Sequence, residues 1–292
     1  ATLDKSYPKT LEQKGIKCIS FNRLNAVAGI IMNHRDHRKI LVIDGKVAFS
    51  GGINIADEYI NINSKYGHWK DNASMVKGEA VWSYTMMFLR TWNSYNRKKE
   101  DYETFKPTLK VKSNGYITPY GTNPLFKEKI GQDVYLNIIN HATEYLYIFT
   151  PYLIIDSDMT NALILAANRG VDVKIVTPGI PDKKIINMIT KSYYDVLIEN
   201  GVKIYEYTPG FIHSKVFISD DEVATVGTIN LDYRSLYHHF ECSTYLYKVD
   251  EIKKIKKDVL STLEKSKEVK KIKTNVFTRF GQSLLRLIAP LL

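Results

Sequence analysis

One stretch of sequence occurs twice in this chain of 292 residues and decides how the chain folds. The first copy starts at His37 and reads HRKILVIDGKVAFSGGINIADEY. The second copy starts at His213, reads HSKVFISDDEVATVGTINLDYRS, and aligns with the first without a gap. Such a pattern indicates an internal duplication. Identical residues recur at fixed offsets from each histidine: Lys at +2 (Lys39, Lys215), Asp at +7 (Asp44, Asp220), Ala at +11 (Ala48, Ala224), Gly at +14 (Gly51, Gly227) and Asn at +17 (Asn54, Asn230).

Each copy has the sequence pattern of a β-hairpin. The apolar runs at 40–43 and 216–218 consist of β-branched, aromatic and leucine residues, which predicts strands. Asp44-Gly45 and Asp220-Asp221 predict the turns, and a second apolar strand follows each turn.

Strands alternate with helices before the second hairpin. The pattern predicts strands at 145–154, 171–177 and 202–207, with helices at 158–168 and 183–199. This alternation favours an α/β fold with a mixed, mostly parallel sheet flanked by helices. The first half shows only the end of the same pattern, a helical stretch up to Lys14-Gly15 and a strand at 16–21. We therefore expect two pseudo-twofold-related domains, of which the first lacks its opening strand–helix–strand.

The predicted domain limits follow from this repeat. Residues 1–110 are expected to form the first domain and residues 119–250 the second. Residues 251–292 are expected to form a basic, amphipathic C-terminal tail. Its end, Val276 to Leu292, sets apolar residues among two arginines, which predicts either a helix lying in an anionic membrane interface or a helix docked on the protein's own core.

Charge and cysteine content narrow the class of protein. Lysine and arginine number 41 against 31 aspartates and glutamates, a formal net charge of +10. This surplus favours a polyanionic partner such as nucleic acid, an anionic membrane or a phosphorylated substrate. Cys18 and Cys242 form no C-x-x-C pair and no zinc-type cluster, so we expect neither a disulfide framework nor a metal centre.

The repeated histidines and lysines have the properties needed to cleave a phosphodiester. Residues i and i+2 of a strand point to one face, so each histidine projects together with the lysine of its own copy. One imidazole can attack phosphorus, the other can protonate the leaving oxygen, and the lysines can stabilise charge on the phosphoryl oxygens. We therefore expect His37, Lys39, His213 and Lys215 to be catalytic, with no metal and no other cofactor.

Other polar residues of the repeat are further candidates. Asp44 and Asp220 belong to the repeated catalytic motif, although local hydrogen bonds also explain an aspartate in a hairpin turn. Asn54 and Asn230 can either donate to the same phosphate or serve a structural role. The glycines at +14 allow a close approach of backbone.

A nucleophilic histidine also needs a carboxylate that fixes its tautomer. Glu241 and Asp71, which follow the two hairpins, are the candidates for this role. The remaining histidines have no partner at an equivalent offset and are assigned to the surface or to the surroundings of the site: His34, His68, His141, His238 and His239.

The motif H-x-K-x4-D, present twice and followed each time by G-[GT]-x-N, resembles the HKD motifs of the phospholipase D superfamily. Longer blocks are similar to bacterial cardiolipin synthases: NHRDHRKILVIDGKVAFSGGINIADEY at 33–59, WKD at 69–71, TPYLIID at 150–156, IPDK at 180–183, INLDYRS at 229–235 and SLLRLIAPLL at 283–292. The resemblance covers almost the whole chain. Members of this family usually begin with two membrane-spanning helices and a complete first domain, so the resemblance implies an N-terminally truncated chain.

The resemblance implies a transphosphatidylation in which two phosphatidylglycerol molecules give cardiolipin and glycerol through a phosphatidyl-histidine, without metal. It implies that His37 is the nucleophile and His213 the acid/base, with Glu241 and Asp71 pairing with the two histidines. The implied partners are phosphatidylglycerol and an anionic membrane surface, at the cytoplasmic face of a bacterial cell membrane, and nucleic acid is disfavoured. Two other functions use the same residues: hydrolysis of lipid headgroups or nucleic acid, and binding of polyanions without catalysis.

Overall fold

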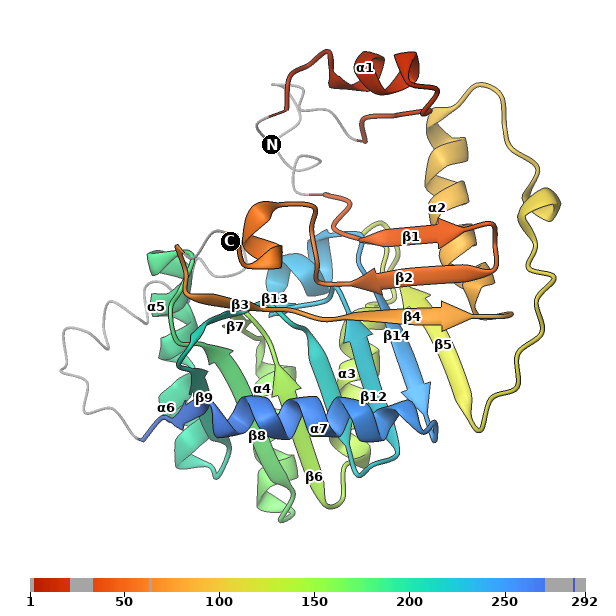
Figure 1. The fold of residues 1–292 in the computed structure, drawn as a ribbon. Helices are drawn as coiled ribbons and strands as arrows, with labels where there is room; N and C mark the ends of the chain where they lie inside the picture. The colour runs from red at the N-terminus through yellow and green to blue at the C-terminus, as the bar shows by residue number, and fades with distance from the viewer. Residues whose placement is uncertain (1–2, 22–33, 63–64, 271–285, 287–292) are drawn as a thin grey trace.

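A mixed sheet of eight strands forms the larger part of the computed structural model, which describes residues 3–21, 34–62, 65–270 and 286 (Figure 1). The strand order is β15-β9-β8-β6-β11-β12-β14-β5. This sheet confirms the predicted α/β class. The strands are β5 (Tyr116–Gly121), β6 (Tyr145–Phe149), β8 (Asp172–Pro178), β9 (Lys203–Tyr207), β11 (Val216–Ser219), β12 (Val223–Gly227), β14 (Cys242–Tyr247) and β15 (Ser266–Glu268).

Parallel pairing in this sheet is less extensive than the sequence predicted. Only β6 with β8 and β8 with β9 pair in parallel, because helices connect these strands. The strands from β11 to β14 are joined by turns and loops and pair antiparallel, as do β5 with β14 and β15 with β9. Short connections can join only antiparallel neighbours, so the sheet is mixed as predicted but not mostly parallel.

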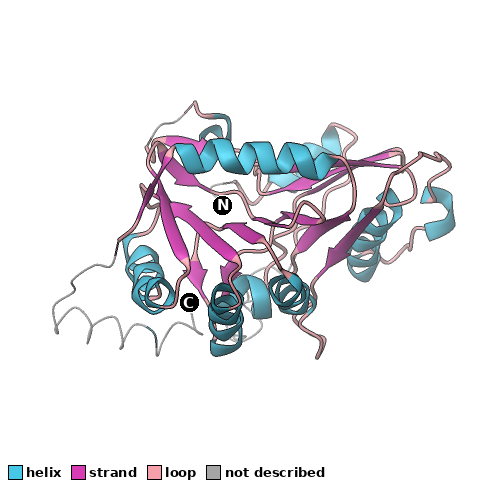
Figure 2. Cartoon of the chain, turned by 90° about the horizontal axis from the view of Figure 1, so that it is seen from below, coloured by secondary structure: helices cyan, strands magenta, loops and turns pink. Residues whose placement is uncertain are grey.

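Helices cover both faces of the large sheet (Figure 2). Four helices and one buried cluster lie on one face: α3 (Ile130–His141), α4 (Ser157–Asn168), α5 (Lys184–Ser192) and α6 (Tyr194–Glu199). The helix α7 (Glu251–Glu264) lies on the other face, where Ile252 and Val259 join a second buried cluster. The boundary predicted at residue 250 is therefore corrected, because α7 and β15 are integral parts of the second unit. Residues 276–285 and 287–292 lie outside the described part of the chain.

A smaller antiparallel sheet carries the first copy of the repeat. Its strands are β1 (Ile40–Ile43), β2 (Val47–Gly51) and β4 (Ala73–Lys77), in the order β1-β2-β4. Helix α2 (Val81–Tyr95) packs on this sheet through Val81 and Tyr84, while α1 (Tyr7–Gln13) lies apart near the N-terminal end (Figure 1). The first unit is thus built on a three-stranded antiparallel sheet, not on the mostly parallel sheet that the repeat predicted.

Short elements complete the two units. They are η2 (Asp57–Ile60), β3 (His68–Lys70), η3 (Tyr102–Phe105), β7 (Leu153–Ile154), β10 (Gly210–Ile212), β13 (Leu231–Asp232) and the π-helical turn η4 (Arg234–His238). Within the second unit, β13 pairs in parallel with β7. Strand β3 of the first unit pairs in parallel with β10 of the second, and a bridge joins Asp36 to Phe240. Backbone pairing therefore crosses between the units beside both histidines.

Local predictions differ from the structure in three places. The strand predicted at 145–154 is split into β6 and β7 at Thr150-Pro151, because proline cannot donate to a ladder. The helix predicted at 183–199 is split into α5 and α6 at Tyr193. Residues 16–21 are not a strand, since no described strand lies beside them to complete a ladder. Within the described ranges, no helix has both the length and the apolar character required to cross a bilayer.

Candidate active site

Both copies of the repeat fold as the predicted hairpins. The turns Asp44-Gly45 and Asp220-Asp221 have positive φ at both positions, between 53° and 65°. Three residues separate the last paired residues of each hairpin, Ile43 from Val47 and Ser219 from Val223. The register of β1 with β2 and of β11 with β12 then places each histidine just before the first strand of its hairpin.

Asp44 and Asp220 lie at the opposite end of the hairpins from the histidines. Seven extended residues span roughly 23 Å, so neither carboxylate reaches the histidine of its own copy. The Asp220 carboxylate instead accepts hydrogen bonds from the backbone N–H groups of residues 143–145 at 2.8 to 3.0 Å. Each aspartate is thus separated from the histidine of its own copy, and its positive φ in the hairpin turn, a conformation that aspartate tolerates, offers a structural reason for its repetition.

Each histidine and the lysine of its own copy form one half-site, and each half-site takes its carboxylate from the other unit. The Nδ1 atom of His37 lies 2.9 Å from both carboxylate oxygens of Glu241, which belongs to the second unit. The Nδ1 atom of His213 lies 2.7 Å from Oδ2 of Asp71, which belongs to the first unit. Each carboxylate favours the tautomer with a proton on Nδ1, which leaves Nε2 available to a substrate.

Backbone hydrogen bonds repeat the same exchange. His37 N–H donates to the carbonyl of Phe240, the residue before Glu241, at 2.9 Å. His213 N–H donates at 2.7 Å to the carbonyl of Lys70, the residue before Asp71. A pseudo-twofold relation between the units therefore holds each imidazole against a carboxylate of the other copy.

The repeated glycines make this close approach possible. A Cβ atom on Gly51 would lie 2.3 Å from the carbonyl oxygen of Asn72, and one on Gly227 would lie 2.4 Å from that of Cys242. Each of these carbonyls belongs to the residue that directly follows a carboxylate of the site, Asp71 or Glu241. The prediction that these glycines admit a second backbone is confirmed.

The two carboxylates have different surroundings. Glu241 is fully buried and accepts hydrogen bonds from Ser235 Oγ at 2.7 Å and from the hydroxyl of Thr228. In the first copy, Gly52 replaces this threonine, and a Cβ atom there would lie 2.2 Å from Oδ1 of Asp71.

The charge of Glu241 is maintained by its neighbours. Burial alone raises the pKa of Glu241, but His37, His239 and Lys39 together lower it well below its usual range. The carboxylate therefore stays ionised inside the protein.

Both lysines of the motif lie in similar electrostatic environments. Each Nζ donates to the backbone carbonyl of the histidine two residues earlier, at 2.7 Å for Lys39. Burial, which outweighs the attraction of Asp71 and is reinforced by the charge of Lys39, lowers the pKa of Lys215 to about 7. Burial likewise lowers the pKa of Lys39, against the attraction of Glu241 and Asp71. The two ammonium groups therefore act on the same carboxylates, although they come from different units.

His213 is enclosed by aromatic rings. Its imidazole centroid lies 5.3 Å from the rings of Trp69 and Tyr59 and 6.0 Å from that of Phe211. Burial and, after it, the charge of Lys215 lower the pKa of His213 to about 3 despite its contact with Asp71. His213 is therefore neutral at pH 7.

The other half-site is more open. The side chain of His37 is 30% exposed and faces a fully buried glutamate. The two imidazoles thus differ in their access to solvent, although the sequence presents them as equivalent.

The asparagines at +17 make local contacts. Asn54 Nδ2 donates to the hydroxyl of Tyr59 at 2.6 Å, and Asn230 Nδ2 donates to Asp232 at 3.1 Å. Asp232 is buried, which raises its pKa. These contacts support the structural role for both asparagines, and a role as phosphate donors remains a prediction.

Sequence reasoning missed several residues of the site. Trp69, Tyr59 and Asp232 lie in blocks that the family resemblance had marked, but none has an identical counterpart at the same offset in the other copy. His239 was assigned to the surface or to the surroundings of the site, and it lies in those surroundings, with Nδ1 3.6 Å from Oε1 of Glu241. Its position depends on the turn η4, which no sequence signal predicted.

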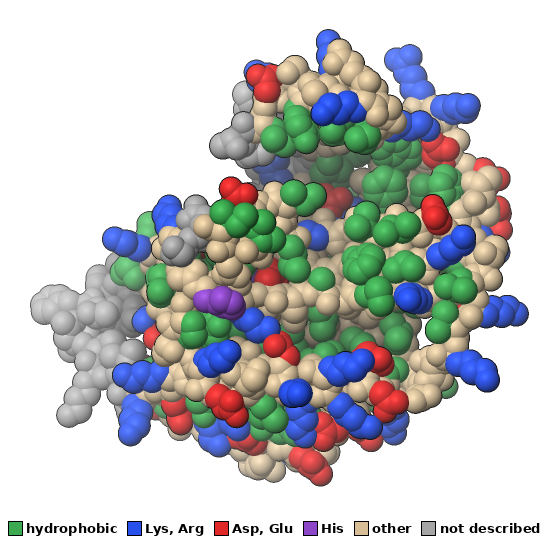
Figure 3. All heavy atoms as spheres, viewed as in Figure 1, with side chains coloured by type: hydrophobic (Ala, Val, Ile, Leu, Met, Phe, Trp, Pro, Cys, Tyr) green, Lys and Arg blue, Asp and Glu red, His purple; other side chains and the backbone are tan. Residues whose placement is uncertain are grey.

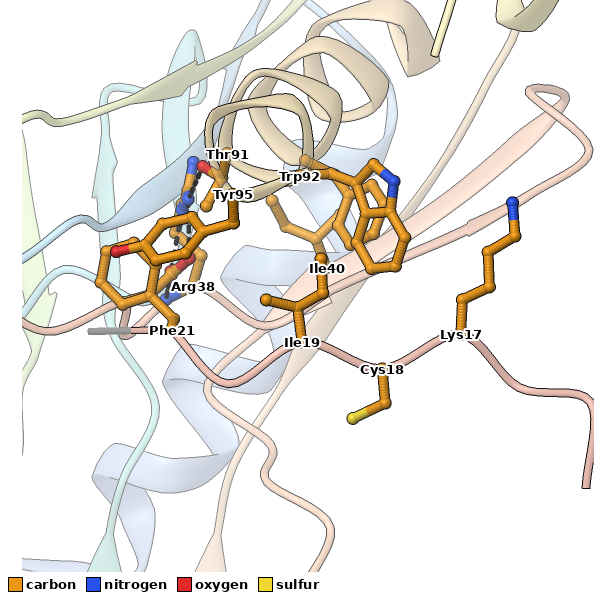
Figure 4. A pocket seen from close by; sticks show the side chains of 11 residues that line it. Lys17, Cys18, Ile19, Phe21, Arg38, Ile40, Thr91, Trp92 and Tyr95 are labelled. Carbon is orange, nitrogen blue, oxygen red and sulfur yellow. Dashed lines mark hydrogen bonds and ion pairs between the residues drawn. The ribbon is translucent and has the colours of Figure 1, made fainter. Parts of the chain in front are cut away.

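A separate pocket of about 380 Å³ lies between residues 17–21, the segment before β1 and helix α2 (Figure 4). Ile19, Phe21, Trp92 and Tyr95 form apolar walls, and Arg38 lies at one end. The Arg38 guanidinium pairs with Asp36 at 2.7 Å. This pocket therefore adjoins the segment of the first histidine, but neither His37 nor His213 lines it.

Comparison with known proteins agrees with this geometry. Residues 135–263 match the family model described as "Cardiolipin synthase, PLD-like domain". A cardiolipin synthase of Alkalihalophilus pseudofirmus is 37% identical over 297 residues, covering 99% of this chain and 59% of that protein. The chain belongs to the phospholipase D superfamily.

Two further relatives of this superfamily member are informative. An uncharacterised protein of Streptococcus mutans is 52% identical over 300 residues, covering 100% of this chain and 64% of that protein. A crystal structure of phosphatidylserine synthase from Haemophilus influenzae is similar with a TM-score of 0.66 at 14% identity, over 88% of this chain and 69% of that one, which supports the shared fold. The chain spans about three fifths of the length of the curated relatives that it matches.

Proposed function

We propose that this protein is a phosphatidyltransferase of the cardiolipin synthase type, which joins two phosphatidylglycerol molecules and releases glycerol. The observation that carries the proposal is the exchanged pair of histidine–carboxylate contacts, His37 with Glu241 and His213 with Asp71. Two imidazoles whose Nε2 atoms make no hydrogen bond within the described residues, beside two lysines, suit attack on a phosphodiester followed by transfer. The relatives named cardiolipin synthase, 36–38% identical over nearly the whole chain, support phosphatidylglycerol as the substrate class.

We assign the first chemical step to His213. A nucleophile needs an unprotonated nitrogen, and the aromatic enclosure keeps His213 neutral. Its Nε2 attacks phosphorus of the first phosphatidylglycerol, a P–N bond forms, and the P–O bond to the headgroup glycerol breaks. Asp71 stabilises the positive charge that develops on the imidazole. The family resemblance implied the opposite roles for the two histidines, and the unequal burial of the two half-sites is our reason for reversing them.

His37 then serves as the acid and the base. Its side chain is partly exposed and Glu241 holds its Nδ1, so Nε2 is the nitrogen that passes a proton to the leaving glycerol oxygen. The neutral imidazole next takes a proton from a headgroup hydroxyl of the second phosphatidylglycerol. That oxygen attacks phosphorus, the P–N bond to His213 breaks, and cardiolipin leaves with the enzyme restored.

A membrane surface is the proposed partner, at the cytoplasmic face of a bacterial cell. Leu41, Ile43 and Met75 expose between 46% and 57% of their surface on β1 and β4. Figure 3 shows apolar side chains gathered over the small sheet, with lysine and arginine side chains around them. An apolar patch within a chain of net charge +10 suits an anionic lipid interface.

The test is an assay with phosphatidylglycerol vesicles and the purified chain. Cardiolipin and glycerol in equal amounts support the proposal, whereas phosphatidic acid alone would assign the site to hydrolysis. His37→Asn and His213→Asn should each reduce transfer by about a thousandfold or more. The control His141→Asn alters an exposed histidine outside the site and should keep the wild-type rate.

The role assignment has its own readout. Quenching the reaction in base, in which phosphohistidine survives, and sequencing the peptides by mass spectrometry locates the phosphatidyl group. We expect the adduct on residue 213, and an adduct on residue 37 would refute the reversed assignment.

A further inference from the structure

Three potential metal ligands meet at one half of the active site. They are the imidazoles of His37 and His239 and the carboxylate of Glu241, whose ligand atoms all lie within 4.8 Å of one another. The two Nδ1 atoms lie 2.9 Å and 3.6 Å from oxygens of Glu241. These separations bracket the edge of about 3.3 Å expected between ligands of a tetrahedral Zn²⁺ ion with bonds of about 2.0 Å.

The imidazole of His239 makes few contacts that compete with a metal ion. Its Nε2 atom is buried and has no hydrogen-bond partner among the described residues. Its Nδ1 makes only the loose contact of 3.6 Å with Glu241, and its ring centroid lies 5.7 Å from that of His37. The ring is therefore held against the carboxylate without strong hydrogen bonds that a metal ion would have to break.

We propose that His37, His239 and Glu241 form a binding site for a divalent transition-metal ion of the Zn²⁺ class, and that occupation of this site stops phosphatidyl transfer. Two imidazoles and one carboxylate are typical ligands of Zn²⁺, whereas Mg²⁺ and Ca²⁺ prefer oxygen ligands alone. Three protein ligands leave a fourth position open to water or a phosphoryl oxygen.

Charge near the site limits which ions bind. The Lys39 ammonium helps to lower the pKa of Glu241, and Glu241 in turn acts on the pKa of Lys215. Both ammonium groups therefore act on the carboxylate and oppose any cation beside it. Only an ion with strong affinity for imidazole overcomes this repulsion, which again favours Zn²⁺ or Cu²⁺ over Mg²⁺.

The inhibitory effect rests on the proposed function, whereas metal binding does not. An ion bound to Nδ1 of His37 takes the place of the Nδ1 proton and leaves a neutral imidazole with a single proton on Nε2. Passing that proton to the leaving glycerol oxygen would leave an imidazolate, so the ion-bound ring is a much weaker acid than an imidazolium. The acid required for the first half of the reaction is lost while the ion stays bound.

The experiment measures binding and activity separately on the purified full chain after treatment with a chelator. Equilibrium dialysis against buffered Zn²⁺ gives affinity and stoichiometry, and the vesicle assay at the same free Zn²⁺ gives the rate relative to each variant's own zinc-free rate. His239→Asn removes the third ligand, and His141→Asn is the matched control at an exposed histidine. His239→Gln replaces the asparagine variant if that variant does not fold.

We expect one ion per wild-type chain, an affinity at least about tenfold weaker in His239→Asn, and no change in His141→Asn. Zn²⁺ should inhibit transfer equally in wild type and His141→Asn, and should inhibit His239→Asn only at higher free Zn²⁺. Chelator should restore the rate. Equal affinity in wild type and His239→Asn would overturn the site, and normal transfer with the site saturated would overturn its inhibitory role. Zinc binding that depends on His239 in a chain without transferase activity would support the site and refute the proposed function.

Discussion

Replacing Glu241 with glutamine tests the exchanged half-site most directly. The side chain is fully buried, and its two oxygens accept from His37, Ser235 and Thr228. The amide keeps the shape but removes the charge and turns one acceptor into a donor that faces other donors. Breaking a buried ionic contact of this kind costs about 3 kcal/mol of unfolding free energy.

The same change should reduce catalysis more than stability. Without the carboxylate, His37 loses the acceptor that orients its ring and holds the proton on Nδ1. Loss of the orienting carboxylate in a comparable histidine pair lowers kcat by about 10⁴, so we expect a reduction of at least about 10³, or roughly 4 kcal/mol in the barrier.

The assay combines cardiolipin formation from phosphatidylglycerol vesicles with unfolding in urea. Glu222→Gln is the matched control, because Glu222 is 55% exposed and its contact with Lys248 at 3.4 Å should contribute less than about 1 kcal/mol. A folded Glu241→Gln protein with kcat within about tenfold of wild type would refute the role given to this carboxylate.

Three other changes test the remaining parts of the structure. Gly227→Ala places a Cβ atom 2.4 Å from a backbone oxygen and should lower the unfolding free energy by about 3 kcal/mol in urea. Lys215 has a folded pKa of about 7, below its unfolded value, so it loses its charge as the pH rises above 7. The value of kcat/KM should then fall about tenfold per pH unit on the alkaline side. Lys215→Arg should move this alkaline fall in kcat/KM to higher pH. Asp220→Ala removes three hydrogen bonds to backbone N–H groups and should lower the unfolding free energy by about 2 kcal/mol. The transfer rate of the folded Asp220→Ala enzyme should stay within a few-fold of wild type. Asp44→Ala, at an exposed turn, should change the unfolding free energy by less than about 1 kcal/mol.

The repeat predicted those features that depend on neighbours in the chain. The structure has strands β1 and β11 and the two turns where the sequence predicted them. It also has a second backbone packed against Gly51 and Gly227, as predicted. Side-chain alternation and turn chemistry are local properties, so one sequence is enough to predict them. Helix breaks such as that at Tyr193 were not predicted, because they depend on packing against the sheet.

The sequence by itself determined that two equivalent histidine–lysine pairs exist and that each precedes a hairpin. Only the tertiary structure decided that each histidine takes its carboxylate from the other unit, that His213 is enclosed and His37 partly exposed, and that His239 reaches Glu241. The partners in the two histidine–carboxylate contacts are 204 and 142 residues apart in the chain. Such contacts form when two folded units dock, and no periodicity within either copy of the repeat encodes the geometry of that docking.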